Sequence, residues 1–282
     1  MNNFKRIINT TLAFILLCLS TNTTFAKSVN FAVVSDIHYK TDKNSQNYST
    51  SEKALYGFTN RTKENKYDFI VFLGDNIDKS KQNLLSDFLD SIKNINTPYY
   101  IVMGDSDVHK ISGMDKKTYL AQVAKHNKLQ KKQEASFKMK SNKDIIFIVI
   151  DSVSSGMPST HGIFTQSTLS WLDTILTNNK NKKVVIFQHV PYMPPYEKES
   201  LDILAKNEYR SVIARHKNIL AIVSGHYHKD FIQIDNSGVT HICIPSLSEE
   251  PYNYGELTIK YDKKLFKKAK NFNIDYKLKP AI

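Results

Sequence analysis

The 282-residue chain is poor in cysteine, with only Cys18 and Cys243. Cys18 lies in an apolar N-terminal run typical of a targeting segment, so a chain processed there keeps one cysteine and forms no internal disulfide. Glycine and proline are also scarce, with nine and eight residues, and no linker-like stretch or internal repeat interrupts the chain. These absences exclude a disulfide-stapled fold, a solenoid and a string of linked modules, and they favour a single domain over residues 27–282.

Residues 1–26 have the pattern of a signal peptide. Lys5 and Arg6 precede the apolar run 7–19, and Thr24-Phe25-Ala26 places small residues before a cleavage site. We therefore expect a periplasmic or secreted protein, with an uncleaved N-terminal anchor as the alternative. No later apolar run approaches the roughly 20 residues that a membrane span needs, so we expect no stable membrane insertion after cleavage.

The chain carries an excess of positive charge, with 39 Lys and Arg against 27 Asp and Glu and a formal net charge of +12. Such a chain attracts phosphates, nucleic acids and anionic surfaces through its summed field. The lysines are nevertheless spread along the whole sequence, without an arginine-rich patch or interleaved aromatic residues. We therefore expect no specific nucleic-acid partner. The sequence leaves the oligomeric state open.

Short apolar and β-branched runs alternate with polar stretches of helix length, which is typical of buried mixed sheets covered by helices. The predicted strands are 31–34, 69–73, 100–103, 145–150, 184–187, 220–223, 231–234, 241–244 and 256–261. The predicted helices are 51–63, 81–93, 116–130, 166–178 and 201–216. Residues 113–140 are rich in lysine and poor in apolar residues, so we predict a peripheral insertion there.

Five of these strands are followed directly by side chains that bind metals, namely Asp36 and His38, Asp75, Asp105, His189, and His226 and His228. Open α/β sheets bind ligands at the carboxyl ends of their strands, so these residues are expected to converge. Three carboxylates and four imidazoles suit Zn, Fe, Mn, Co or Ni better than calcium, and they suffice for two ions that share a carboxylate. Taken singly, each Asp is more often a turn residue, and we assign Asp107 and Asp151 to that role.

These blocks resemble the motif set of the calcineurin-like metallophosphoesterases, in the family's order. The matching blocks are Asp36-x-His38, Gly74-Asp75-x-x-Asp78, Gly104-Asp105-Ser106-Asp107, His189 and Gly225-His226-x-His228. The residues between the third and fourth blocks resemble the branch that contains purple acid phosphatases and class III cyclic nucleotide phosphodiesterases. They are Ile150-Asp151-Ser152, His161-Gly162, Gln166 and Trp171-Leu172.

The resemblance implies a four-layer α/β/β/α sandwich, in which helices flank two mixed sheets. It also implies two metal ions, Fe, Mn or Zn, held by the seven residues above with Asp75 as the bridge. The implied activity is hydrolysis of a small phosphate ester by a hydroxide that bridges the ions.

The third block departs from the family pattern, because Asp105 and Ser106 stand where the family usually has Asn and His. Serine cannot deliver a proton at neutral pH as imidazole does. We therefore predict His109 as a displaced acid, Asp78 as a residue that orients Asp75 or a ligand histidine, and Ser106, Tyr192 and His161 as substrate-binding residues.

Loss of the acid favours a phosphodiester or an activated monoester, because the leaving group of such an ester needs less protonation. The alternative is a dinuclear metal-binding protein of the same fold with little or no catalytic activity.

Overall fold

The computed structural model describes residues 24–41, 49–154, 159–204, 206–264 and 268–282. The predicted signal peptide lies outside the described residues up to position 23, and strand β1 begins at Thr24. The described residues divide into two compact units, one formed by those within 30–257 and 276–282 and one by residues 24–29, 258–264 and 268–275. Among the described residues no helix is both long enough and apolar enough to cross a membrane.

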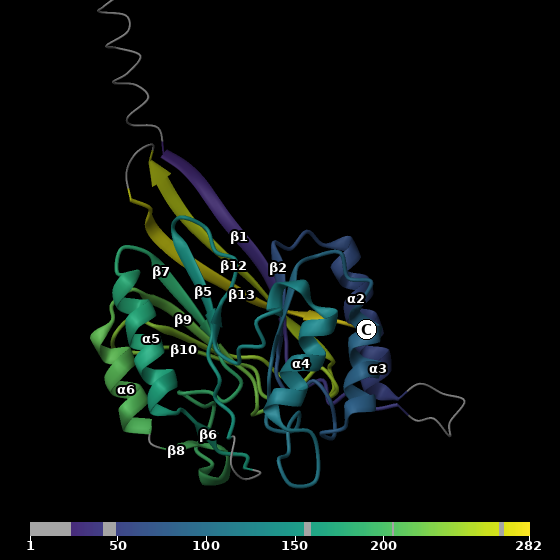
Figure 1. The fold of residues 1–282 in the computed structure, drawn as a ribbon. Helices are drawn as coiled ribbons and strands as arrows, with labels where there is room; N and C mark the ends of the chain where they lie inside the picture. The colour runs from purple at the N-terminus through teal and green to yellow at the C-terminus, as the bar shows by residue number, and fades with distance from the viewer. Residues whose placement is uncertain (1–23, 42–48, 155–158, 205, 265–267) are drawn as a thin grey trace, which may run out of the picture. The chain divides into compact units, whose positions relative to one another are not determined.

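Two large sheets organise the chain (Figure 1). The first has the order β13-β12-β1-β2-β3, with bounds Lys270–Pro280, Asn253–Lys264, Thr24–Val34, Phe69–Leu73 and Tyr99–Val102. The second has the order β10-β11-β9-β7-β5-β4, with bounds Phe231–Ile234, Thr240–Cys243, Ile219–Ser224, Lys183–Phe187, Ile145–Val149 and Phe137–Lys138. Strands β1, β2 and β3 run parallel, as do β5, β7, β9 and β11.

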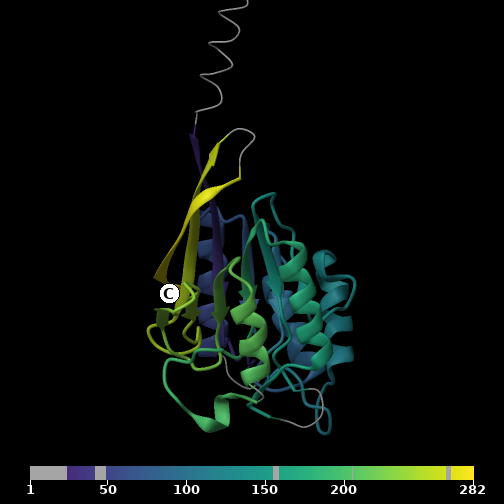
Figure 2. The same cartoon turned by 90° about the vertical axis from the view of Figure 1, so that its left-hand side faces the viewer.

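Helices cover the outer face of each sheet (Figures 1 and 2). The helices α2 (Thr50–Glu64), α3 (Gln82–Ile92) and α4 (Lys116–His126) pack on the first sheet, and α5 (Gln166–Asn178) and α6 (Lys206–Arg215) pack on the second. Between the sheets, the rings of Phe31 and Phe69 contact those of Phe147 and Phe187. The predicted four-layer α/β/β/α sandwich is thus confirmed.

Local sequence explains where the helices begin. Ser49 and Glu52 form a reciprocal capping box at the start of α2, which satisfies two backbone N–H groups that lack partners within the helix. In α3, an apolar stripe of Leu85, Phe88 and Ile92 recurs at helical spacing and is fully buried against the sheet.

The prediction of one helix over residues 201–216 is wrong at its N-terminal end. Residues Glu199–Leu201 form a short 3-10 turn, and Ile203–Leu204 form strand β8, which pairs with β6 at Gly162–Ile163. The backbone of Gly162 donates to the Asp202 carbonyl at 3.1 Å. Pairing with a distant segment therefore replaces helix formation at these positions.

The prediction of a peripheral insertion at residues 113–140 is also wrong. Tyr119 and Val123 of α4 are almost fully buried in the core of the first sheet. Gln130, in the 3-10 turn Lys128–Gln130, accepts from the backbone N–H of Ile101 and donates to its carbonyl, both at 2.8 Å. A few apolar residues four positions apart suffice to dock a helix whose other positions are lysine and polar.

The smaller unit contains residues 258–264 of β12 and 270–275 of β13. Within it, the rings of Tyr261 and Phe272 are stacked with centroids 5.0 Å apart. Lys260 and Asp275 form an ion pair at 2.7 Å. Cross-strand pairs of this kind stabilise two-stranded segments.

Candidate metal centre

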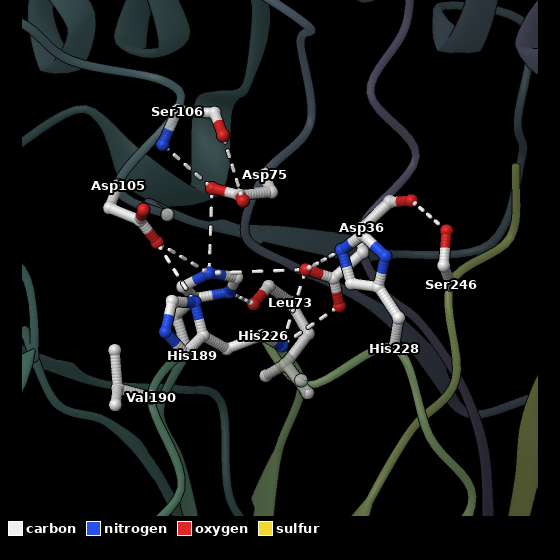
Figure 3. A network of polar contacts seen from close by, with 12 residues as sticks. Asp36, Leu73, Asp75, Asp105, Ser106, His189, Val190, His226, His228 and Ser246 are labelled. Carbon is white, nitrogen blue, oxygen red and sulfur yellow. Dashed lines mark hydrogen bonds and ion pairs between the residues drawn. The ribbon is translucent and has the colours of Figure 1, made fainter. Parts of the chain in front are cut away.

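Seven Asp and His side chains gather at the ends of the strands, and Figure 3 shows most of them. They form two groups, and within each group the donor atoms lie within 4.8 Å of one another. One group is Asp75, Asp105, His189 and His226, and the other is Asp36, His38 and His228. We call these seven residues the donor cluster. The structure thus brings together all seven ligands that the sequence predicts.

The topology places the cluster at the carboxyl ends of parallel strands. In chain order, Asp36 and His38 follow β1, Asp75 follows β2, Asp105 follows β3, His189 follows β7, and His226 and His228 follow β9. The first sheet therefore supplies three carboxylates and one imidazole, and the second supplies three imidazoles. Ligands at this edge are expected for sheets of this kind.

Asp75 lies between the two groups. Its Oδ1 is 3.4 Å from His189 Nε2, and its Oδ2 is 3.7 Å from His38 Nε2. Elsewhere in the cluster, Asp105 Oδ1 is 3.1 Å from His189 Nε2 and 3.0 Å from His226 Nδ1. One carboxylate thus faces both sets of donors, which is the arrangement that a bridging ligand needs.

The backbone at the cluster is unusual. Asp36, His38, Asp75, His226 and His228 all have positive φ, with values between 44° and 71°. Residues other than glycine seldom adopt this left-handed region, and such residues are concentrated at functional sites. The tight turns that carry these ligands therefore hold them in a conformation that their sequence alone does not favour.

The glycines beside the ligands are required by close contact. Gly74 has φ +102°, and a Cβ at this position would lie 2.5 Å from His189 Nδ1. A Cβ on Gly225 would lie 1.9 Å from Ser35 Oγ and 2.6 Å from Asp36 Oδ2. These positions admit no side chain without moving a member of the donor cluster.

The orientation of the histidines fits metal binding. His189 Nδ1 is 3.0 Å from the Leu73 carbonyl, which can only accept, so Nδ1 carries the proton and Nε2 is left to face the cluster. His228 Nδ1 likewise donates to the Glu249 carboxylate at 2.5 Å, with its Nε2 directed to Asp36 Oδ1 at 3.5 Å. Ligand histidines in metalloproteins are typically held by partners of this kind.

The charges of the cluster act strongly on one another. Burial alone disfavours a charged imidazole at His189, but Asp75, Asp105 and Asp36 outweigh it and raise the pKa well above its usual value. For His228 the same balance, set by burial against Asp36 and Glu249, raises the pKa to about 9. Three carboxylates in so small a volume attract positive charge, which metal ions supply when bound.

Ser106 supports Asp75. Its backbone N–H donates to Asp75 Oδ1 at 2.8 Å, and its hydroxyl donates to Oδ2 at 2.9 Å. Its predicted contact with substrate stays a prediction, while the structure shows a contact with the central carboxylate.

The two predicted catalytic residues lie outside this network. The His109 imidazole contacts Ser112, with Nδ1 3.0 Å from Oγ. Asp78 donates its backbone N–H to the Tyr39 carbonyl at 3.1 Å. Within the described chain neither side chain forms a hydrogen bond to the donor cluster, so the orienting contact predicted for Asp78 is not seen.

Of the other predicted substrate residues, Tyr192 lies against the second sheet and His161 lies beside the two-stranded sheet of β6 and β8. Tyr192 packs on Tyr209 and His241, with ring centroids 5.4 and 5.7 Å apart. His161 is half-buried next to β6, with Nδ1 3.4 Å from the Asp202 carbonyl. Substrate binding by these two residues stays a prediction.

Both aspartates assigned to turns hold their local backbone. Asp107 is fully buried and accepts the backbone N–H groups of Gly104 and Ile77 at 2.9 and 3.0 Å. Asp151 accepts from the backbone of Val153 at 3.1 Å and forms an ion pair with Lys116 at 2.5 Å.

Sequence reasoning missed Glu249 and Ser246. Ser246 donates its hydroxyl to the Asp36 carbonyl at 2.7 Å, and Glu249 holds His228 as described above. Both residues follow β11, the next parallel strand of the second sheet. Applying the strand-end rule to that strand would have found Ser246, whereas Glu249 lies six residues beyond the strand.

Comparison with known proteins now identifies the family, because residues 29–230 match the model of the calcineurin-like phosphoesterases. The chain belongs to the calcineurin-like phosphoesterase family. The matched region contains the whole donor cluster, so the ligands predicted from the resemblance lie within the family's own domain.

Individual relatives are distant. A manganese-dependent ADP-ribose/CDP-alcohol diphosphatase from Arabidopsis thaliana is 30% identical over 102 residues, which are 34% of this chain and 32% of that protein. The chain thus spans about a third of the length of this relative. A probable cyclic nucleotide phosphodiesterase from Coxiella burnetii is 22% identical over 206 residues, which are 72% of this chain and 77% of that protein.

Among solved structures, a dimetal phosphatase from Danio rerio is similar with a TM-score of 0.62 and 15% sequence identity. The match covers 83% of this chain and 95% of that one. At this identity the likeness shows that the calcineurin-like phosphoesterase fold is shared.

Proposed function

We propose that the protein is a dinuclear metal-dependent hydrolase of small phosphate esters that acts outside the cytoplasm. The observation that carries the proposal is the donor cluster, in which Asp75 faces two sets of one carboxylate and two imidazoles each. Mixed oxygen and nitrogen donors suit Mn, Fe or Zn. Family membership and the manganese-dependent relative support the same assignment.

The chemistry that two ions supply at such a site is activation of water and neutralisation of phosphate charge. The chain's residues hold and orient the donors for that chemistry. His38 and His228 with Asp36 would hold one ion. Asp105 with His189 and His226 would hold the other, and Asp75 would contact both.

Within the cluster, two contacts fix the donors. Ser106 holds both oxygens of Asp75, and the Leu73 carbonyl fixes the tautomer of His189. Donors held in this way need no rearrangement when the substrate binds.

A phosphodiester substrate fits the groups that this site offers for protonating a leaving group. The Ser106 hydroxyl is engaged with Asp75, and the His109 imidazole contacts Ser112. A site without a nearby imidazole acid favours esters whose leaving group departs with little protonation. The phosphodiesterase relative from Coxiella burnetii agrees with this preference.

The test combines metal content with turnover in the full-length protein. Protein purified without chelator is expected to carry about two equivalents of metal, measured by elemental analysis. With added Mn, Zn or Fe it should hydrolyse bis-p-nitrophenyl phosphate faster than p-nitrophenyl phosphate.

Asp75→Asn should lower turnover at least about a hundredfold, because it removes the shared carboxylate. Asp90→Asn, an exposed position on α3, is the matched control and should keep wild-type turnover. Absence of metal from the wild type would contradict the proposal, as would an Asp75→Asn variant as active as the wild type.

Among the described residues, the Ser106 hydroxyl is engaged with Asp75 and the His109 imidazole with Ser112. This also favours a second candidate, a dinuclear metal-binding protein without appreciable catalysis. This candidate expects about two equivalents of metal and no hydrolysis of either ester. Hydrolysis of either ester by the wild type, together with its loss in Asp75→Asn, would exclude this candidate.

The extracytoplasmic location rests on the N-terminal sequence alone, with its basic start, apolar run and small residues near position 26. Expression in a bacterial host with fractionation and N-terminal sequencing tests it. Cleavage after Ala26 and recovery outside the cytoplasm are expected. An uncleaved chain in the cytoplasm would contradict the location without affecting the proposed chemistry.

A further inference from the structure

The proposed metal positions have matched donors. The first position is Asp36, His38 and His228, and the second position is Asp105, His189 and His226. Each has one carboxylate and two imidazoles of its own, and each faces one oxygen of Asp75. Because ion affinity follows donor type and charge, these donors alone predict two positions of similar affinity.

The two positions differ in the group behind one imidazole. In the second position, His189 Nδ1 donates to the Leu73 backbone carbonyl at 3.0 Å, which is a neutral acceptor. In the first position, His228 Nδ1 donates to the Glu249 carboxylate at 2.5 Å. A carboxylate behind a ligating imidazole fixes its orientation and increases its basicity.

The loop that carries Glu249 is anchored at the first position. The Ser246 hydroxyl donates to the Asp36 carbonyl at 2.7 Å, and the backbone N–H of Leu247 donates to the Ser35 carbonyl at 3.0 Å. The loop therefore holds the backbone of one donor through Ser246 and the imidazole of another through Glu249. The Glu249 side chain is 55% exposed, so its charge is partly screened and its effect should be moderate.

We infer that Glu249 is a positioning residue that makes the first metal position the tighter of the two. The inference rests on the dinuclear centre of the proposed function and adds the order in which its two positions fill and empty. When metal is scarce, the first ion binds to Asp36, His38 and His228. During dialysis against chelator, the second position empties first.

Manganese titration of the full-length protein, freed of metal by chelator and followed by calorimetry, measures the two affinities. The wild type should bind in two resolved steps. Glu249→Gln keeps an acceptor oxygen and removes the charge, so the tighter step should weaken about tenfold. Glu249→Ala removes the acceptor as well and should weaken that step by about tenfold to a hundredfold, while the weaker step stays unchanged.

Glu250→Gln is the matched control, because it removes the same charge one residue away, where the side chain contacts the Tyr252 hydroxyl. It should leave both steps at their wild-type affinity. Two further variants, each lacking one donor carboxylate, show which binding step belongs to which metal position. In Asp105→Ala, which leaves no donor at that position, Glu249→Gln should still weaken the remaining tight step, whereas in Asp36→Asn it should have no effect.

The inference is overturned if Glu249→Gln leaves both steps unchanged, if Glu250→Gln has the same effect, or if the response persists in Asp36→Asn. A wild type that binds no manganese would overturn the dinuclear centre itself. Because the readout is affinity, a protein that binds two ions without hydrolysing any ester still tests the role of Glu249.

Discussion

At the residue scale, the serine at position 106 has a different role from the histidine that the family usually has there. Ser106 stands where the related motif usually has histidine, and both its N–H and its hydroxyl donate to Asp75. The short serine side chain reaches the central carboxylate. The substitution removes a proton donor and adds a support for a ligand.

Gly74 gives a prediction at the same scale. Gly74→Ala should lower manganese affinity by about tenfold or more, because the new Cβ would displace the His189 imidazole. Gly238→Ala is the control, since Gly238 also has positive φ, at +82°, but nothing lies within 4 Å of a Cβ there. Both variants should lose about 1–2 kcal/mol of stability from backbone strain.

Calorimetric titration and urea denaturation of both variants separate the two effects. Equal manganese affinity in Gly74→Ala and Gly238→Ala would show that His189 tolerates the added methyl group.

The seven members of the donor cluster were predictable because each follows a strand directly. Glu249 was not predicted because it lies six residues beyond β11, and its partner His228 is 21 residues away. Contacts made by irregular loops depend on how the loop folds back. The sequence pattern around Glu249 carries no periodicity that would reveal this contact.

At the scale of elements, buried strands were the most predictable feature. Strands 69–73, 145–150 and 184–187 were predicted within about one residue of the observed β2, β5 and β7, because each is a continuous apolar run. The errors occurred where long-range contact decides the structure. Strand β8 forms only because β6 is beside it, and α4 docks through two buried side chains in a lysine-rich stretch.

The hairpin of β10 and β11 gives a pH prediction. His241 on β11 is 2% exposed, and burial lowers its pKa below the usual 6.5 despite a hydrogen bond with Asp235. The folded protein therefore binds this proton more weakly than the unfolded chain. The stability contributed by neutral His241 is complete above pH 6.5 and is lost as the pH falls through the folded-state pKa.

Urea denaturation of wild type and His241→Gln at about pH 7.5 and 5.5 measures the effect. The wild type should lose more stability than the variant on acidification. All other ionisable groups are the same in both proteins, so their contributions cancel in the comparison. Identical losses in the two proteins would exclude a contribution from His241.

At the scale of the molecule, the donor cluster links the two sheets. Loops of the first sheet supply Asp36, His38, Asp75 and Asp105, and loops of the second supply His189, His226 and His228. Each proposed position takes donors from both sheets. Bound ions would therefore cross-link the two sheets of the sandwich in addition to supporting hydrolysis.

Metal removal should consequently destabilise the fold. An ion present at a hundred times its dissociation constant contributes about 2.7 kcal/mol if only the folded chain binds it. For a chain of this size, that corresponds to a fall in Tm of roughly 5–10 °C for each ion removed. Calorimetric scans with manganese and with excess chelator measure the shift.

Asp75→Asn, scanned under the same two conditions, is the control and should shift much less. An unchanged wild-type Tm after complete metal removal would mean that the sheets are held without the ions.

The left-handed backbone at five members of the cluster lowers the stability of the fold while it holds the donors in place. Glycine tolerates that conformation better than aspartate or histidine, yet it supplies no donor atom from a side chain. A lineage freed from selection for hydrolysis would gain stability by replacing the residues that the reaction needs most. In this fold the ligands would therefore be among the first residues lost once the activity no longer mattered, while the surrounding strands persisted.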